Sequence, residues 1–133
     1  MNSLNDNLDM LLIPVSWGEL YDKISILNLK MAKVSDIIAK KNIENELNFL
    51  NGVVQANSIG SPHIKYLCDE LILTNEHIWA IENDIRKKEA LGNFDNGFID
   101  SARSARRWND KRAAIKYEIN DILKSTIVEE KIY

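Results

Sequence analysis

Apolar residues recur at alternating intervals of three and four along most of this chain, and that spacing constrains its fold more than any other feature. One series runs from Leu20 to Ile38, a second from Ile64 to Ile85, and a third, less regular, from Phe98 to Ile122. Such intervals place the apolar side chains on one face of an α-helix, and no strand-like alternation of useful length is present. The sequence therefore predicts an all-α protein, an antiparallel helical bundle of about four helices in a single domain, residues 1–133.

Capping residues and the few prolines and glycines set the predicted helix boundaries. Ser16 and Glu19 match a capping box, Ser61-Pro62 is typical of a helix start, and Gly92 is typical of a helix end. We expect helices at about 16–35, 36–56, 62–91 and 98–124, with loops at 57–62 and 93–97. Because the caps at Ser35-Asp36 are weak, a single long helix over 16–56 remains an alternative.

The two ends of the chain lack helical periodicity. Residues 1–7 are polar, and we expect them to be loose. Residues 10–15 form a short extended segment before the first helix, which could be a lone edge strand, and residues 126–133 form a C-terminal tail.

Length and charge limit the classes of protein to which the chain can belong. A chain of 133 residues can bury one core without disulfides or metals, and Cys68 is the single cysteine. The 17 Lys and Arg against 20 Asp and Glu argue against a general nucleic-acid binder. No apolar run is long enough to span a membrane, and the start of the chain lacks the basic residues of a secretory signal. We therefore expect a cytoplasmic protein with no nucleic-acid partner and no membrane span.

Opposite charges are segregated between the last two predicted helices. Residues 69–84 carry five acids and no Lys or Arg, whereas residues 103–116 carry six bases and one acid, Asp110. Consecutive helices joined by a short turn pack as antiparallel neighbours. We therefore expect the acidic and basic faces to meet in interhelical ion pairs beside a solvated basic rim.

Arg112 interrupts the apolar seam of the last helix, because it falls between Trp108 and Ile115. An unpaired guanidinium in such a place would be costly, so Arg112 needs a carboxylate partner or an anionic ligand. Glu82 is the first candidate partner, and Glu19 or Asp22 is the next.

A polar and aromatic stripe lies beside the apolar seam of the third helix. Its members follow one another at intervals of four, three and four: Asn75, Trp79, Glu82 and Arg86. Tryptophans at such positions either fill the core or form the wall of a ligand pocket. Both readings remain open for Trp17, Trp79 and Trp108.

The sequence does not indicate a metal or a cofactor. His63 and His77 have no second His or Cys at the spacing of zinc ligands, and Cys68 is expected to be a buried thiol. The carboxylate pairs Glu19/Asp22 and Glu118/Asp121 could hold magnesium. Lysines nearby in the sequence favour ordinary surface pairs instead.

Several segments together resemble a family of short bacterial proteins known only as a domain of unknown function. They are residues 14–24, 78–86, 98–120 and 128–131, and the resemblance covers nearly the whole chain. Genes of that family often lie near genes for sugar transfer and cell-envelope polysaccharide, which implies an accessory role. The segment 106–108 departs from the family pattern, so the shape of any pocket can differ here.

These observations give a leading hypothesis and two alternatives. The leading hypothesis is a non-catalytic binding or accessory module whose polar network fixes helix register or holds an anionic small molecule, of the sugar phosphate or nucleotide sugar class. The alternatives are a small enzyme, with Arg103, Arg112 and Lys116 as clamps and Glu19 or Glu82 as acid or base, and a homodimer. The candidate ligand-binding residues are Trp17, Glu19, Asp22, Lys23, Asn75, Trp79, Glu82, Arg86, Arg103, Asn109, Arg112 and Lys116.

Overall fold

The computed structural model describes residues 9–57 and 60–133, and this part of the chain is folded into helices without any strand. The helices are α1 (Trp17–Lys33), α2 (Ile37–Asn57), α3 (Pro62–Leu91) and α4 (Asn96–Ile122). The all-α prediction is thus confirmed. The predicted loose start at residues 1–7 and part of the predicted loop 57–62 lie outside the described residues.

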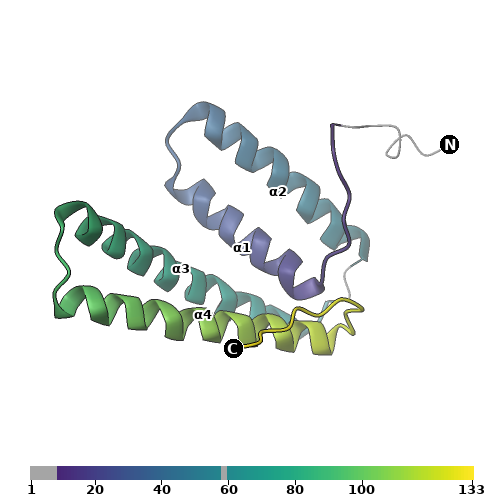
Figure 1. The fold of residues 1–133 in the computed structure, drawn as a ribbon. Coiled ribbons are helices and arrows are strands. Elements are labelled where there is room, and N and C mark those ends of the chain that lie inside the picture. Colours follow the sequence, from purple (N-terminus) through teal and green to yellow (C-terminus); the bar gives the residue numbers. More distant parts are fainter. Residues whose placement is uncertain (1–8, 58–59) are drawn as a thin grey trace.

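The helices form two hairpins that pack against each other. Figure 1 shows α1 and α2 as one antiparallel pair and α3 and α4 as the other. α1 contacts all three other helices, whereas α2 contacts only α1. Helix α1 is therefore the element that joins the bundle together.

Local capping explains where the helices begin and end. Ser16 Oγ accepts a hydrogen bond from Glu19 N at 3.1 Å, as the capping box predicts. The Glu19 carboxylate, however, accepts a hydrogen bond from Lys116, so only this half of the box is observed. Ser61 caps α3 in the same way, and Gly92 ends α3 in the left-handed conformation with φ 66°.

One helix boundary decides between the alternatives that the sequence left open, and another differs from the prediction. Asp36 Oδ2 accepts a hydrogen bond from Ala39 N at 2.8 Å at the start of α2, so residues 16–56 form two helices and not one. Helix α4 begins two residues earlier than predicted, because Asp95 accepts hydrogen bonds from Gly97 N and Phe98 N.

The core lies between α3, α4 and the first half of α1. Leu71 of α3 and Ile119 of α4 are both 0% exposed. The buried residues around them are Leu20, Leu27, Ile64, Leu67, Ala105 and Ile115. The predicted seam therefore faces the core, with two corrections. Ile38 is 73% exposed, because α1 ends before it, and Ala102 is exposed near the start of α4.

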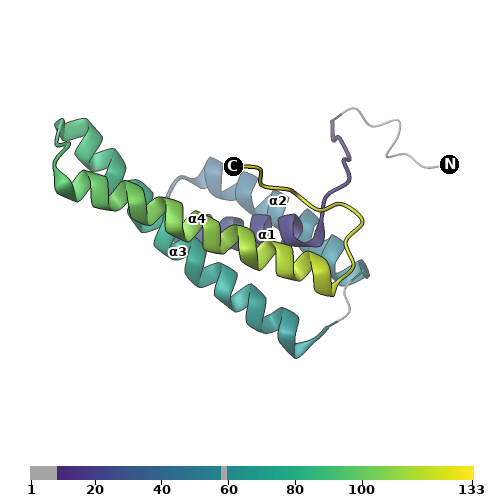
Figure 2. The same ribbon diagram turned by 60° about the horizontal axis from the view of Figure 1, so that its bottom comes forward.

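The segments at either end of the bundle are extended. Residues 11–15 form no strand, so the edge-strand prediction is wrong for this described segment. After α4 the tail turns back across that helix toward the start of α1, as Figure 2 shows. Ser125 Oγ accepts a hydrogen bond from Trp17 N at 2.8 Å, which fixes the beginning of the tail to α1.

Candidate functional site

A buried carboxylate on α1 is the centre of a polar network that joins three helices. Asp22 is 1% exposed and accepts hydrogen bonds from Arg112 Nε at 3.0 Å and 3.1 Å, and a further one from Arg112 Nη2. Asn75 Nδ2 of α3 donates to Asp22 Oδ1 at 3.0 Å and lies 3.1 Å from Ser25 Oγ. The first candidate partner of Arg112 was wrong: the guanidinium pairs with Asp22, the later candidate, and not with Glu82.

Lys116, one turn after Arg112 on α4, adds a second cation to this network. Its Nζ lies 2.7 Å from Glu19 Oε2, 3.6 Å from Asp22 Oδ2 and 3.6 Å from Glu129 Oε1. We call Glu19, Asp22, Arg112 and Lys116 the ionic cluster. In the described part of the chain, no buried side-chain nitrogen or oxygen lacks a hydrogen-bond partner. The buried atoms of the ionic cluster therefore all have hydrogen-bond partners within the protein.

The charges in the ionic cluster stabilise one another against the cost of burial. Burial raises the pKa of Asp22, but the hydrogen bonds from Arg112 and Asn75 and the charges of Arg112 and Lys116 hold that pKa below its ordinary value. Burial lowers the pKa of Lys116, but the hydrogen bond to Glu19 and the charges of Asp22 and Glu19 raise it overall. Both groups are therefore ionised at neutral pH.

A close approach of two backbones places Lys116 against the first turn of α1. Gly18 N donates a hydrogen bond to Asn120 Oδ1 at 2.6 Å. A Cβ at Gly18 would collide with the Lys116 carbonyl oxygen and would lie 2.9 Å from Asn120 Oδ1. Only glycine fits at position 18, so this residue allows α1 to lie close to Lys116 of the ionic cluster.

A groove opens beside the ionic cluster, on the side of Arg112 that faces the second half of α3. It has a volume of about 340 Å³. We call it the groove, and its lining residues are Ile26, Leu29, Asn75, Ile78, Trp79, Glu82, Asn83, Arg86 and Arg112. Lys33 Nζ lies 5.7 Å from the centre of the Trp79 ring, at cation–π distance.

Two charged side chains of the groove have no partner among the residues that the structure describes. Glu82 and Arg86 make no ion pair and no side-chain hydrogen bond with any other described residue, although they are four residues apart on α3. They differ in this from Arg112, whose guanidinium is held by Asp22. The groove therefore offers one cation and one carboxylate to a ligand.

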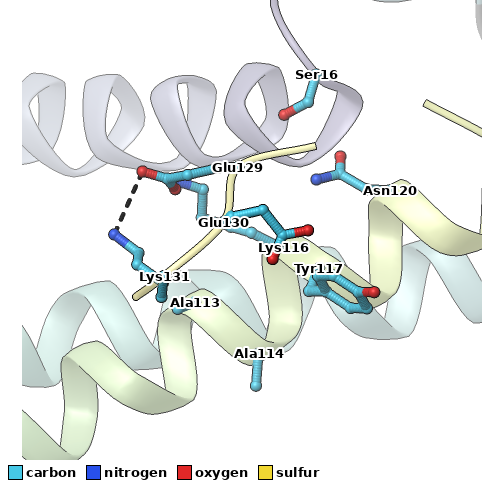
Figure 3. A pocket seen from close by; sticks show the side chains of 9 residues that line it. All are labelled: Ser16, Ala113, Ala114, Lys116, Tyr117, Asn120, Glu129, Glu130 and Lys131. Atoms are coloured by element: carbon cyan, nitrogen blue, oxygen red, sulfur yellow. Dashed lines mark hydrogen bonds and ion pairs between the residues drawn. The ribbon is translucent and has the colours of Figure 1, made fainter. Parts of the chain in front are cut away.

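A second hollow of about 250 Å³ lies under the C-terminal tail. Figure 3 shows its lining, with Glu129, Glu130 and Lys131 of the tail lying over Lys116, Tyr117 and Asn120 of α4. Its main cation, Lys116, is 13% exposed and is already paired with Glu19. This hollow therefore offers less to an anion than the groove does.

The structure separates the twelve candidate residues into three groups. Asn75, Trp79, Glu82, Arg86 and Arg112 line the groove, and Glu19, Asp22 and Lys116 complete the ionic cluster. The other four lie outside both. Trp17 stacks on Tyr21 at 5.9 Å, Asn109 donates to its own helix at Ala105 O, and Lys23 and Arg103 are exposed.

The expected meeting of acidic and basic faces occurs only in part. Within the described residues, one ion pair joins an acid of 69–84 to a base of 103–116. It is the pair of Glu70 and Lys111, at 3.7 Å. Arg112 and Lys116 pair with α1 instead. The other basic side chains of α4, Arg103, Arg106 and Arg107, form the exposed rim that the sequence predicted.

Three polar residues that contact the ionic cluster or a residue beside it were not among the candidates. Asn120 continues the spacing of four from Arg112 and Lys116, and Ser25 follows Asp22 by three residues, so helical periodicity could have found both. Glu129 lies in the tail, where no periodicity indicates which residue meets Lys116.

The described residues include no group of three His, Cys, Asp or Glu side chains that could hold a metal ion. The carboxylates of Glu19 and Asp22 bind Lys116 and Arg112, and Glu118 lies 3.3 Å from His63. Burial raises the pKa of the partly buried Cys68 to about 11, so this thiol is protonated at neutral pH. None of the described helices is long and apolar enough to cross a membrane.

The fold and site define a helical-bundle protein in which a satisfied ionic cluster supports an adjacent groove. The family of unknown function DUF6165 matches residues 11–133 of this sequence, and the chain belongs to that family. No curated protein and no solved structure matches the chain.

Proposed function

We propose that this protein is a binding module, accessory to other cytoplasmic proteins, that holds a small anionic molecule of the sugar phosphate or nucleotide sugar class in the groove. The observation that carries the proposal is the pair of unpartnered charges, Glu82 and Arg86, beside the ring of Trp79. The resemblance to proteins encoded near sugar-transfer genes is compatible with this class of ligand.

The side chains of Arg86, Glu82 and Trp79 match three parts of such a ligand. Arg86 can hold a phosphate with two parallel hydrogen bonds, and Lys33 adds a second cation beside Trp79. Glu82 is an acceptor for hydroxyl groups, and the indole face of Trp79 suits the apolar face of a sugar ring. A bare anion would use only the cationic half of this groove, so Glu82 favours a ligand that carries hydroxyls as well as charge.

The ionic cluster has a supporting role in this proposal. Arg112 reaches the groove while Asp22 holds its Nε and Nη2, so its position is fixed before any ligand arrives. The enzyme alternative would need Arg112 and Lys116 as free clamps, yet both already pair with α1, and Glu19 is bound to Lys116. Of the two acid or base candidates for that alternative, Glu19 is paired with Lys116, and Glu82 makes no ion pair with a described residue.

A thermal-shift screen with a matched variant tests the proposal. The panel contains nucleotides, nucleotide sugars, sugar phosphates and dicarboxylates, each with and without magnesium. We expect a concentration-dependent rise in melting temperature for one phosphorylated sugar class, because a ligand that binds only the folded state stabilises it. The rise should disappear in Arg86→Gln and persist in Arg107→Gln, an exposed arginine of α4 outside the groove.

A flat screen, or an equal rise in Arg86→Gln and the wild type, would contradict the proposal. Chemical turnover of the stabilising compound, lost in Glu82→Gln with binding retained, would favour the enzyme instead.

A further inference from the structure

The turn between α3 and α4 carries exposed apolar side chains at the end of a projecting hairpin. In both Figure 1 and Figure 2 this turn extends beyond α1 and α2. Leu91 is 80% exposed, Phe94 is 58% exposed and Ile99 is 44% exposed. None of the three is among the residues that line the groove.

Phe94 and Ile99 belong to one surface through Phe98, and Leu91 lies three residues before Phe94 at the same turn. The rings of Phe94 and Phe98 meet edge to face at 5.2 Å between centres. Phe98, Ile99 and Ala102 share a shallow hollow with Arg103 and Arg106. We call this surface the tip patch, and its members are Leu91, Phe94, Phe98, Ile99, Ala102, Arg103 and Arg106.

The charge around the tip patch is opposite to that of the rest of the chain. Residues 87–107 contain five Lys and Arg against three Asp and Glu, whereas the remaining residues contain twelve against seventeen. One of the five, Lys88, is paired with Asp84, and the other four make no ion pair with a described residue. One of the three acids, Asp95, accepts hydrogen bonds from the first backbone N–H groups of α4. The tip patch is therefore a locally cationic surface on a protein that is acidic overall.

We propose that the tip patch is a docking site for an anionic lipid surface, where Leu91 and Phe94 enter the interfacial region and Arg103 and Arg106 contact lipid phosphates. Exposed aromatic and aliphatic side chains flanked by Arg or Lys are the combination that binds at the boundary of headgroups and acyl chains. A projecting turn is convex, so it can enter the deformable surface of a bilayer. It would make only a small contact with a partner that has a flat face. Contact with nucleic acid would use the arginines without a need for Leu91 or Ile99.

A second exposed apolar face, on the outer side of α2, does not share this charge pattern. Ile38, Phe49 and Val53 are exposed there, but the helix carries two lysines and two glutamates, which cancel. Its residues therefore serve as controls, because their substitution also removes exposed apolar surface from a helix, without the cationic surroundings.

Co-sedimentation of the full chain with vesicles tests the proposal. We expect binding to vesicles of phosphatidylcholine mixed with phosphatidylglycerol, weaker binding to phosphatidylcholine alone, and a decrease as salt is raised. The double variant Leu91→Ser/Phe94→Ser should lower the affinity about tenfold or more, because it removes the inserted apolar area. Arg103→Gln/Arg106→Gln should lower it on the anionic vesicles and remove most of the salt dependence.

The control variant Phe49→Ser/Val53→Ser should bind vesicles as the wild type does. Circular dichroism shows whether each variant is folded, and because all the substituted side chains are exposed, the helical signal should be unchanged. Failure of the folded wild type to bind anionic vesicles would overturn the proposal. So would an equal loss in the control, or a short DNA duplex that binds through the same arginines and displaces the vesicles.

Discussion

The pair formed by Asp22 and Arg112 makes a direct prediction about single residues. Replacing Arg112 with Met leaves a carboxylate that is 1% exposed without its main partner. Removal of one member of a buried ion pair costs about 3–5 kcal/mol, so we expect the free energy of unfolding in urea to fall by about that amount. Arg107→Met, an exposed arginine on the same helix, should change it by less than about 0.5 kcal/mol.

A double variant separates the charge from the packing. Asp22→Leu/Arg112→Met removes both charges and should recover much of the stability lost in Arg112→Met. If Arg112→Met left stability and every ligand interaction unchanged, the role assigned to Arg112 would be wrong.

The depressed pKa of Asp22 predicts how stability depends on pH. The folded protein holds the Asp22 carboxylate ionised below its ordinary pKa of 3.8, so in that range the unfolded chain binds more protons. The contribution of Asp22 to stability is therefore complete above about pH 5 and is lost as the pH falls through its pKa in the folded protein.

Urea unfolding at pH 6 and at pH 3 measures this effect. The loss of stability between the two values should be larger in the wild type than in Asp22→Asn, while Asp110→Asn, an exposed acid of α4, should behave as the wild type. Equal losses in the wild type and Asp22→Asn would exclude Asp22 as the titrating group.

Residue-level reasoning identified that Arg112 needs a partner, but it did not identify which one. The need follows from the sequence, because a charge in an apolar seam must be compensated. The choice between Asp22 and Glu82 depends on the angle at which α1 crosses the α3–α4 hairpin. The spacing of residues within one helix does not determine that angle. Glu129 was missed for the same reason, since its contact depends on the path of the tail.

At the scale of the helices, two glycines give opposite predictions for the same substitution. Gly18→Ala forces α1 away from the Lys116 carbonyl and should lower the free energy of unfolding by about 1–3 kcal/mol. Gly52 lies within α2 with nothing within 4 Å of an added Cβ, so Gly52→Ala should raise it by about 0.5–1 kcal/mol.

Urea unfolding of the two variants checks both signs. An unchanged or increased stability in Gly18→Ala would mean that α1 and α4 are not in close contact there.

Helix number and most helix ends could be predicted from the sequence, because capping and periodicity are local. Ser61, Pro62 and Gly92 mark α3 where the structure has it, and Asp36 starts α2. Asp95 was passed over as part of a turn, although its side chain caps α4. Burial was less predictable. Helix α2 also carries apolar residues at helical spacing, yet none of its residues is buried, because α1 is the only helix of the described chain that packs on it.

At the scale of the whole molecule, this uneven burial predicts uneven stability. Helix α2 contacts only α1, whereas α1, α3 and α4 pack on one another. We expect amide hydrogen exchange to be fastest in α2 and slowest around Leu71 and Ile119, because local opening costs least where few apolar contacts are lost. Equal protection of α2 and the first half of α3 would contradict this.

The homodimer that the sequence suggested stays a prediction. The apolar seam of α1 packs inside the chain, so the surface left for a second copy includes Ile127 and Val128 of the tail, both exposed. Sedimentation velocity measures the mass directly. A dimer that persists in Ile127→Ser/Val128→Ser would use another surface.

The long sequence separation between Asp22 and Arg112 also has a consequence for the growing polypeptide. The two residues are 90 positions apart, and Gly18 and Asn120 are 102 apart. During synthesis, α1 and α2 leave the ribosome before the arginine that neutralises Asp22 has been translated. The nascent α1 therefore keeps its carboxylate hydrated until α4 emerges, and the bundle closes only after α4 has left the ribosome.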